Sequence, residues 1–200
     1  GRVAGEAAAA YVRGVRHNNN GVGALLEEES LRQERINEGL LRQEGDENPY
    51  ALHRELGDLM RNKVGIVRDN ATLDEGIAGL VELEERFSRV SITEKSAWAN
   101  ASLPYARQVH EMIVLARVIA TSARKRDEFR GAHYKPAFEI PIPEGKFPGD
   151  PEWDEYVDAW KANNAQWLKT TIASHFPDGP EISYRPIDTT VFPPEKPRDY

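Results

Sequence analysis

The residues of this sequence best suited to chemistry lie together between Arg126 and His133, in the run RDEFRGAH. Arg126, Glu128, Arg130 and His133 follow a long apolar stretch, at the point where a helix should end. Two arginines and a histidine suit a substrate with two carboxylates, because paired N–H donors bind both oxygens of a carboxylate. The same groups could instead bind the unpaired carbonyls of a helix end, where the helix dipole also favours positive charge. The residue types alone favour this bracing role.

No other motif for catalysis or cofactor binding stands out. His110-Glu111 begins the zinc-protease pattern H-E-x-x-H, but Val114 occupies the place of the second histidine, which argues against a metal site. The sequence has no dinucleotide-binding glycine motif, Walker loop or nucleophile elbow. The remaining histidines are scattered, at His17, His53 and His175. Outside the run RDEFRGAH, the motifs therefore indicate neither a metal site nor a cofactor site.

The composition is that of a globular protein. The 200 residues are 40% hydrophobic and 30% charged, with a net charge of -7. A negative chain argues against nucleic acid as the main partner, since phosphate binding needs a concentrated basic face. There is no cysteine, which excludes disulfides and thiolate metal sites. No apolar run approaches the roughly 20 residues that a membrane-spanning helix needs.

The elements that must position the run RDEFRGAH are predicted to be helices. Asn48-Pro49 supplies an N-cap followed by a first-turn proline, and Thr72-x-x-Glu75 matches a capping box. Residues 112–120 are apolar nearly all round, which is typical of a central helix covered by its neighbours. The predicted helices cover residues 1–15, 25–43, 48 to about 64, 72 to about 87, and about 104–125.

The composition changes after His133. Eleven of the 13 prolines lie between Pro136 and Pro197, so this part cannot be a continuous helical bundle. A helix is still predicted over about 151–172, a short strand over 182–185, and an extended end over the last dozen residues. The predicted fold is therefore mainly α. It is a three-helix, spectrin-repeat-like bundle over residues 48–125, preceded by one or two helices and followed by an irregular, proline-rich tail.

Several separated blocks resemble one family. RDEFRGAH is similar to the R-x-E-S-R-G-A-H signature of succinate dehydrogenase and fumarate reductase flavoprotein subunits, and the following YKP resembles its Bacillus-like members. Two departures are Phe129, where the family has serine, and the stretch 139–164, which is longer than usual. The other matching blocks are HRELGDLM at 53–60, SAWAN at 96–100, ARQ at 106–108, LKTT at 168–171 and RDY at 198–200.

This resemblance implies a division of the chain into three parts. Residues 1–22 would be the truncated end of the FAD-binding domain, 23–135 the helical C-terminal domain, and 136–200 an extended tail. The family's flavin-attachment histidine, hydride-transfer residues and FAD-binding glycines match no position here. The resemblance thus implies FAD in the intact protein and no cofactor in this fragment. It makes Arg126, Glu128, Arg130 and His133 family-signature residues that brace the domain or form an interface.

The resemblance also implies an activity for the intact subunit. The subunit would oxidise succinate to fumarate, or catalyse the reverse, and pass electrons to an iron-sulfur subunit and to quinone. Expected partners are the N-terminal FAD and capping domains, the iron-sulfur subunit and, indirectly, a membrane-anchor cytochrome b subunit. The complex would be cytoplasmic, on the inner face of the plasma membrane. The fragment is expected to be an inactive scaffold that can self-associate. The alternatives are the C-terminal domain of L-aspartate oxidase and a stand-alone helical interaction protein.

Overall fold

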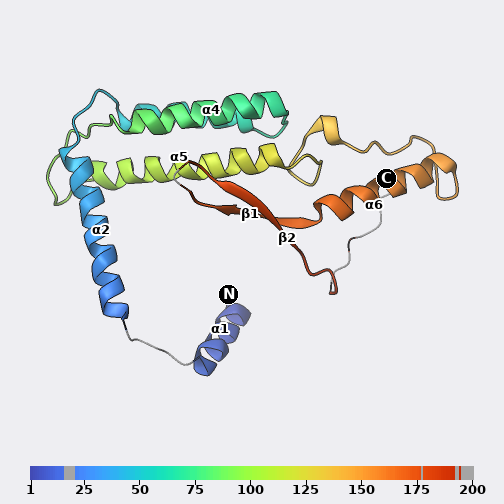
Figure 1. Cartoon of the computed structure of the whole chain (residues 1–200), viewed down its shortest axis with the longest axis horizontal. Coiled ribbons are helices and arrows are strands. Elements are labelled where there is room, and N and C mark those ends of the chain that lie inside the picture. The colour runs from blue at the N-terminus through green and yellow to red at the C-terminus, as the bar shows by residue number, and fades with distance from the viewer. Residues whose placement is uncertain (16–20, 177, 192–193, 195–200) are drawn as a thin grey trace.

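The computed structural model describes residues 1–15, 21–176, 178–191 and 194, and it confirms a mainly α fold (Figure 1). His17 and the RDY block at 198–200 lie outside the described residues. The elements are, in order, α1 (Arg2–Gly14), α2 (Val22–Arg42), α3 (Pro49–Leu59), the π-helical turn η1 (Met60–Val64), α4 (Asn70–Phe87), α5 (Ser102–Lys125), the 3-10 turn η2 (Pro136–Phe138), α6 (Pro151–Trp167), β1 (Lys169–Ser174) and β2 (Glu181–Pro186).

The three-helix bundle consists of α3 with η1, α4 and α5. α3 begins as predicted, because the Asn48 side chain accepts a hydrogen bond of 2.8 Å from the Tyr50 backbone N–H and Pro49 occupies the first turn. The predicted capping box at Thr72 is wrong. Asp69 is the N-cap of α4, and its carboxylate accepts a 2.9 Å hydrogen bond from the Thr72 N–H, so the helix starts before Thr72.

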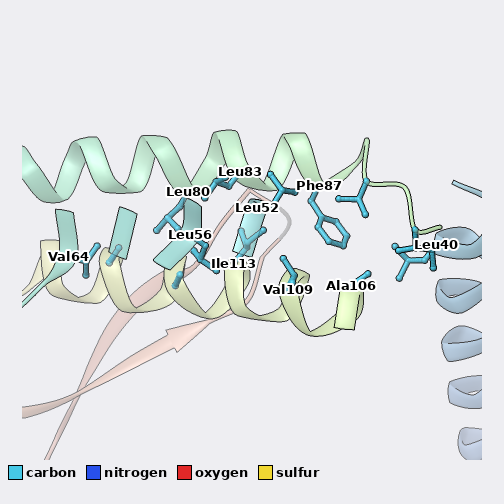
Figure 2. Close-up of a cluster of buried hydrophobic side chains, with 14 of the residues drawn as sticks. Leu40, Leu52, Leu56, Val64, Leu80, Leu83, Phe87, Ala106, Val109 and Ile113 are labelled. Atoms are coloured by element: carbon cyan, nitrogen blue, oxygen red, sulfur yellow. The ribbon is translucent and has the colours of Figure 1, made fainter. Parts of the chain in front are cut away.

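Aliphatic side chains fill the space between the three helices (Figure 2). Leu52 of α3, Leu80 of α4 and Ile113 of α5 are completely buried. Leu40 extends this core from the end of α2. Burial of these side chains supplies the main driving force for folding of the bundle.

One expectation about α5 is corrected. Residues 112–120 are not covered on all sides, because 57% of Leu115 and 41% of Ile119 are exposed. α3 and α4 cover only the face of α5 that carries Ile113, Ala116 and Ala120. The opposite face of α5 is an apolar surface without a bundle helix over it.

The first two helices make few contacts with the bundle. α2 extends away from it, and α1 lies farther out (Figure 1). Leu40 is the buried residue of α2, whereas Leu25, Leu26 and Leu31 are more than half exposed. No residue of α1 is buried. An isolated helix shorter than about 12–15 residues is marginal in water, so α1 needs a packing surface that the described chain does not supply.

The tail places a hairpin beside α5. β1 and β2 pair antiparallel, with Thr171 opposite Tyr184, and both strands contact α5. The strand predicted over 182–185 is confirmed. The helix predicted over about 151–172 ends earlier, at Trp167, because the backbone from Lys169 onward pairs with β2. Most of the extended end predicted for the last dozen residues lies outside the described chain.

Gly45, in the link between α2 and α3, lies against the backbone of Arg89. A Cβ atom there would stand 1.9 Å from the Arg89 carbonyl oxygen, which already accepts a 3.1 Å hydrogen bond from the Glu47 N–H. We expect Gly45→Ala to lower the free energy of unfolding in urea by about 1–3 kcal/mol, as overpacking does. Gly39→Ala is the matched control. Gly39 is helical with open space around it, so this change should leave stability equal or raise it by up to about 1 kcal/mol. Equal stability of the two variants would contradict the prediction.

Candidate functional site

The run RDEFRGAH follows α5 at one end of the bundle. The link between η1 and α4, the exit from α5, the end of α6 and the start of β1 all meet there. Arg68 comes from the first of these segments, Asn70 is the first residue of α4, and Asn163 and Asn164 belong to α6. The structure thus brings Arg126, Glu128, Arg130 and His133 together, as their spacing suggested, and adds partners distant in sequence.

Glu128 lies at the centre of the cluster and is completely buried. One of its carboxylate oxygens accepts from Arg126. The other accepts from Arg130 Nε at 2.9 Å and from Asn163 Nδ2 at 3.3 Å. A buried carboxylate is stable only when it is paired and hydrogen-bonded. Two guanidinium groups and an amide meet that requirement here.

Arg126 joins the exit of α5 to the tail. Its Nη1 donates to the Lys169 carbonyl at 3.1 Å and to Thr171 Oγ1 at 3.0 Å, and its Nη2 donates to the Trp167 carbonyl. The guanidinium also lies 5.7 Å from the centre of the Trp167 ring. These acceptors lie where α6 ends and β1 begins, so Arg126 satisfies carbonyls that the end of α6 leaves free.

Arg130 and His133 close a tight turn. Each backbone N–H donates to the carbonyl of the other residue at 3.0 Å, and Gly131 within the turn has a left-handed φ of 56°. The Arg130 side chain extends to Asn164 Oδ1 of α6 at 2.7 Å. Phe129, the departure from the family signature, packs against the Tyr134 ring at a centroid distance of 4.9 Å. The large apolar side chain therefore has a neighbour of its own outside the polar cluster.

The His133 ring joins the bundle to this turn. Arg68 Nη1 lies 2.9 Å from His133 Nδ1, and His133 Nε2 lies 2.7 Å from the Arg126 carbonyl oxygen. Burial lowers the pKa of His133 below its ordinary value of 6.5. The hydrogen bond to the Arg126 carbonyl opposes that shift, and the positive charges of Arg68 and Lys135 add to it. The ring is therefore neutral at neutral pH.

A second polar centre, which the sequence reasoning missed, surrounds Lys135. Its side chain is buried, and Nζ donates to Asn70 Oδ1 at 2.7 Å, to Asp127 Oδ1 at 2.9 Å and to the Arg124 carbonyl at 3.2 Å. Burial lowers the pKa of Lys135, and the Asp127 carboxylate partly offsets that effect. The lysine of the YKP block was the available signal, but its partner Asn70 is distant in sequence.

The arginine N–H groups of this cluster already donate to acceptors within the protein, and this limits what else the cluster can bind. The guanidinium groups of Arg126 and Arg130 point at Glu128 and at acceptors of the tail. A substrate dicarboxylate would have to displace Glu128 from a fully buried position. The arrangement is that of an internal polar joint between the bundle and the tail.

The described residues include no strand-to-helix turn of the kind that holds a flavin dinucleotide in a doubly wound fold. Such a cofactor lies on a glycine-rich turn between a parallel strand and a helix. In the described chain the only sheet is the antiparallel pair β1–β2, whose strands are joined directly by a loop. The glycines with left-handed φ are in loops or at a helix start, at Gly21, Gly131, Gly145, Gly149 and Gly179.

An open groove of about 580 Å³ lies between α2 and α5. Its apolar lining includes Ile36 of α2 and the partly exposed Leu115 of α5. Arg107 crosses from α5 to α2, where Nη1 donates to Asn37 Oδ1 at 2.9 Å. Ile36 belongs to the same helix as the exposed Leu25 and Leu26, which we call the apolar face of α2. The groove and this face are suited to pack against another apolar surface.

The histidines outside the run RDEFRGAH are dispersed in the described structure. His53 Nδ1 lies 2.6 Å from the Tyr105 hydroxyl, the His110 ring packs on Phe87 at 4.9 Å, and His175 lines the groove. Across the ranges that the structure describes, no three histidine, aspartate or glutamate side chains gather as a metal ion would require. In the same ranges, no helix has the length and hydropathy that a bilayer crossing needs.

Comparison with known proteins gives a consistent set of matches. The family profile described as fumarate reductase flavoprotein C-term matches residues 53–200. The succinate dehydrogenase flavoprotein subunit of Bacillus subtilis is 34% identical over 203 residues, covering 100% of this chain and 31% of that protein. The fumarate reductase flavoprotein subunit of Escherichia coli is 30% identical over 197 residues, covering 98% of this chain and 29% of that protein.

The fold is similar to parts of larger chains in solved structures. A quinol fumarate reductase of Escherichia coli superposes with a TM-score of 0.67 at 28% identity, covering 91% of this chain and 27% of that one. The Sdh1 complex of Mycobacterium smegmatis in the apo form gives a TM-score of 0.53 at 29% identity, covering 66% and 21%. The chain thus spans about a third or less of the proteins it matches.

Proposed function

Since the chain belongs to the family of fumarate reductase and succinate dehydrogenase flavoprotein C-terminal domains, we propose that it is the structural module of such a subunit and carries no catalytic residue. The main support for this proposal is that the charged side chains of the family signature already have hydrogen-bond partners within the chain. Arg126, Glu128 and Arg130 bind one another and the tail, which leaves no group of the signature poised for a substrate.

The four signature residues hold the tail on the bundle in this proposal. Glu128 is the buried hub, and Arg126 and Arg130 connect it to β1 and α6. His133 connects the same turn to Arg68. The parts are residues 1–22 at the end of a flavin domain, 23–135 as the helical domain, and 136–200 as the tail.

The intact subunit would hold FAD outside the residues described here and would interconvert succinate and fumarate. Electrons would pass between the flavin, an iron-sulfur subunit and quinone. The names of the relatives, and a matched solved structure of a quinol-fumarate reductase with menaquinol molecules, support this. Through an iron-sulfur subunit and a cytochrome b anchor, the complex would lie on the inner face of the plasma membrane.

The exposed apolar surfaces are the contact area for the flavin and capping domains in this proposal. They comprise α1, the apolar face of α2 and the groove between α2 and α5. Large exposed apolar patches mark interaction sites, and they promote association when their partner is absent. The isolated chain is therefore proposed to self-associate through them.

The proposal predicts that the purified 200-residue chain binds no FAD and does not oxidise succinate. Flavin binding is measured by fluorescence quenching, and succinate oxidation by reduction of an artificial electron acceptor. The homologous Bacillus subtilis subunit, prepared in parallel, is the positive control. Tight FAD binding together with succinate oxidation by the chain alone would contradict the proposal.

A chimera tests the domain assignment directly. The matching segment of the Bacillus subtilis subunit is replaced by this chain, and activity is assayed with succinate and with L-aspartate. Retained succinate oxidation supports the proposed module. A chimera that assembles with flavin but oxidises only L-aspartate would favour the aspartate oxidase alternative.

A further inference from the structure

His133 is held between two partners that together suit only one protonation state of its ring. Arg68 Nη1, at 2.9 Å from Nδ1, can only donate, so Nδ1 must be an acceptor without a proton. The Arg126 carbonyl oxygen, at 2.7 Å from Nε2, can only accept, so Nε2 must carry the proton. The neutral Nε2–H tautomer satisfies both contacts. A protonated ring would direct a second N–H at the N–H groups of Arg68.

The charges around the ring oppose a further positive charge. Arg68 faces it from the link between η1 and α4, and Lys135 lies near it in the segment that follows α5. Glu128 is the nearby negative charge, but its two oxygens already accept from Arg126 and Arg130. Burial of the ring acts in the same direction as the two cations.

The contact with Arg68 joins two parts of the molecule. Arg68 Nε donates to the carbonyls of Val64 at 2.8 Å and Gly65 at 2.9 Å, which fixes the side chain to the end of η1. The Arg68 backbone N–H donates to the Tyr134 carbonyl at 2.9 Å. The segment after α5 is thus fastened to the far end of the α3–η1 helix beside the His133 ring.

We propose that His133 is a pH-sensitive latch, whose protonation in mild acid breaks the contact with Arg68 and releases the segment after α5 from the η1–α4 link. Above pH 6.5 the ring is neutral and the latch is closed. Because the released ring has its ordinary affinity for a proton and the closed ring a lower one, opening increases as the pH falls below 6.5. It stops increasing below the pKa of the closed state. Each pKa unit between the two states corresponds to about a tenfold rise in opening.

The first test uses the unmodified chain labelled with ¹³C and ¹⁵N. We expect the ring nitrogens of His133 to show the Nε2–H tautomer at pH 7.5 and to titrate below 6.5. The reporter of opening is hydrogen exchange of the Arg68 amide, corrected for the intrinsic pH dependence of exchange. Protection of the Arg68 amide should fall on acidification, about tenfold for each unit by which the measured pKa of His133 lies below 6.5. Titration at or above 6.5, or an Nδ1–H tautomer, would overturn the proposal.

The second test removes the titration but keeps a donor and an acceptor. In His133→Gln the amide presents an N–H and an oxygen without a proton equilibrium, so the acid-induced loss of Arg68 protection should disappear. His110→Gln is the matched control, since His110 packs on Phe87 away from the latch, and it should keep the wild-type response. An unchanged acid response in His133→Gln would overturn the latch. If that variant does not fold, the titration of the unmodified chain alone decides.

Discussion

Replacement of Glu128 by alanine is expected to lower the free energy of unfolding of the chain by about 3 kcal/mol. Glu128 is completely buried, whereas 16% of the Arg126 side chain and 38% of the Arg130 side chain are exposed. The change leaves both guanidinium groups without their carboxylate, and Arg126 stays largely desolvated. Arg126 keeps its carbonyl partners in the tail and Arg130 can be hydrated, so the loss should lie near the lower end of the range for broken buried pairs. Urea denaturation followed by circular dichroism measures it.

An exposed glutamate serves as a control, because it shows how much of the loss comes from burial of the ion pair and how much from pairing alone. Glu29 also binds an arginine with both carboxylate oxygens, but it lies on the surface of α2, where half of its side chain is exposed. Glu29→Ala should leave the unfolding midpoint close to that of the unmodified chain, because exposed ion pairs contribute little. Glu128→Gln should be intermediate, since the amide still accepts from one arginine. If Glu128→Ala had the same urea midpoint as the unmodified chain, the stabilising role of the buried Glu128 carboxylate would be contradicted.

Replacement of Leu80 by alanine is expected to cost about 2–5 kcal/mol. Leu80 of α4 is completely buried and lies between α3 and α5, facing Leu56 and Ile113 (Figure 2). Removing its isobutyl group leaves a cavity that three packed helices cannot fully close. The loss of stability then includes the transfer free energy of the removed methyl groups and the van der Waals contacts that the surrounding side chains no longer make. Urea denaturation measures the change.

The control for Leu80 is the same substitution on the uncovered face of α5. Leu115 is 57% exposed, so at concentrations where the chain is monomeric Leu115→Ala should change its stability by well under about 1 kcal/mol. The same variant in the proposed full-length chimera should weaken packing of the flavin domain, because that domain would cover the groove. A cost for Leu115→Ala equal to that for Leu80→Ala in the isolated chain would mean that the α5 face is buried in solution.

The helices of the bundle and the family can both be predicted from short stretches of sequence. Helical periodicity and the Asn48-Pro49 start depend only on residues a few positions apart, and the structure confirms both predictions. The predicted start of α4 is wrong, because Asp69, and not Thr72, is the residue whose side chain caps the first turn. Several ordered motif blocks were sufficient to identify the family.

The construction of the cluster after α5 depends on tertiary contacts that short stretches of sequence do not reveal. Glu128 and His133 were read from the sequence as members of a helix-end group, but their burial and their partners Asn163 and Arg68 depend on segments far along the chain. The end of α6 was likewise set by pairing of β1 with β2, and the exposure of Leu115 by which neighbours lie over α5. Local patterns report the conformation of a few consecutive residues. Burial and hydrogen-bond partners depend on which distant segments meet, and that is determined by packing of the whole chain.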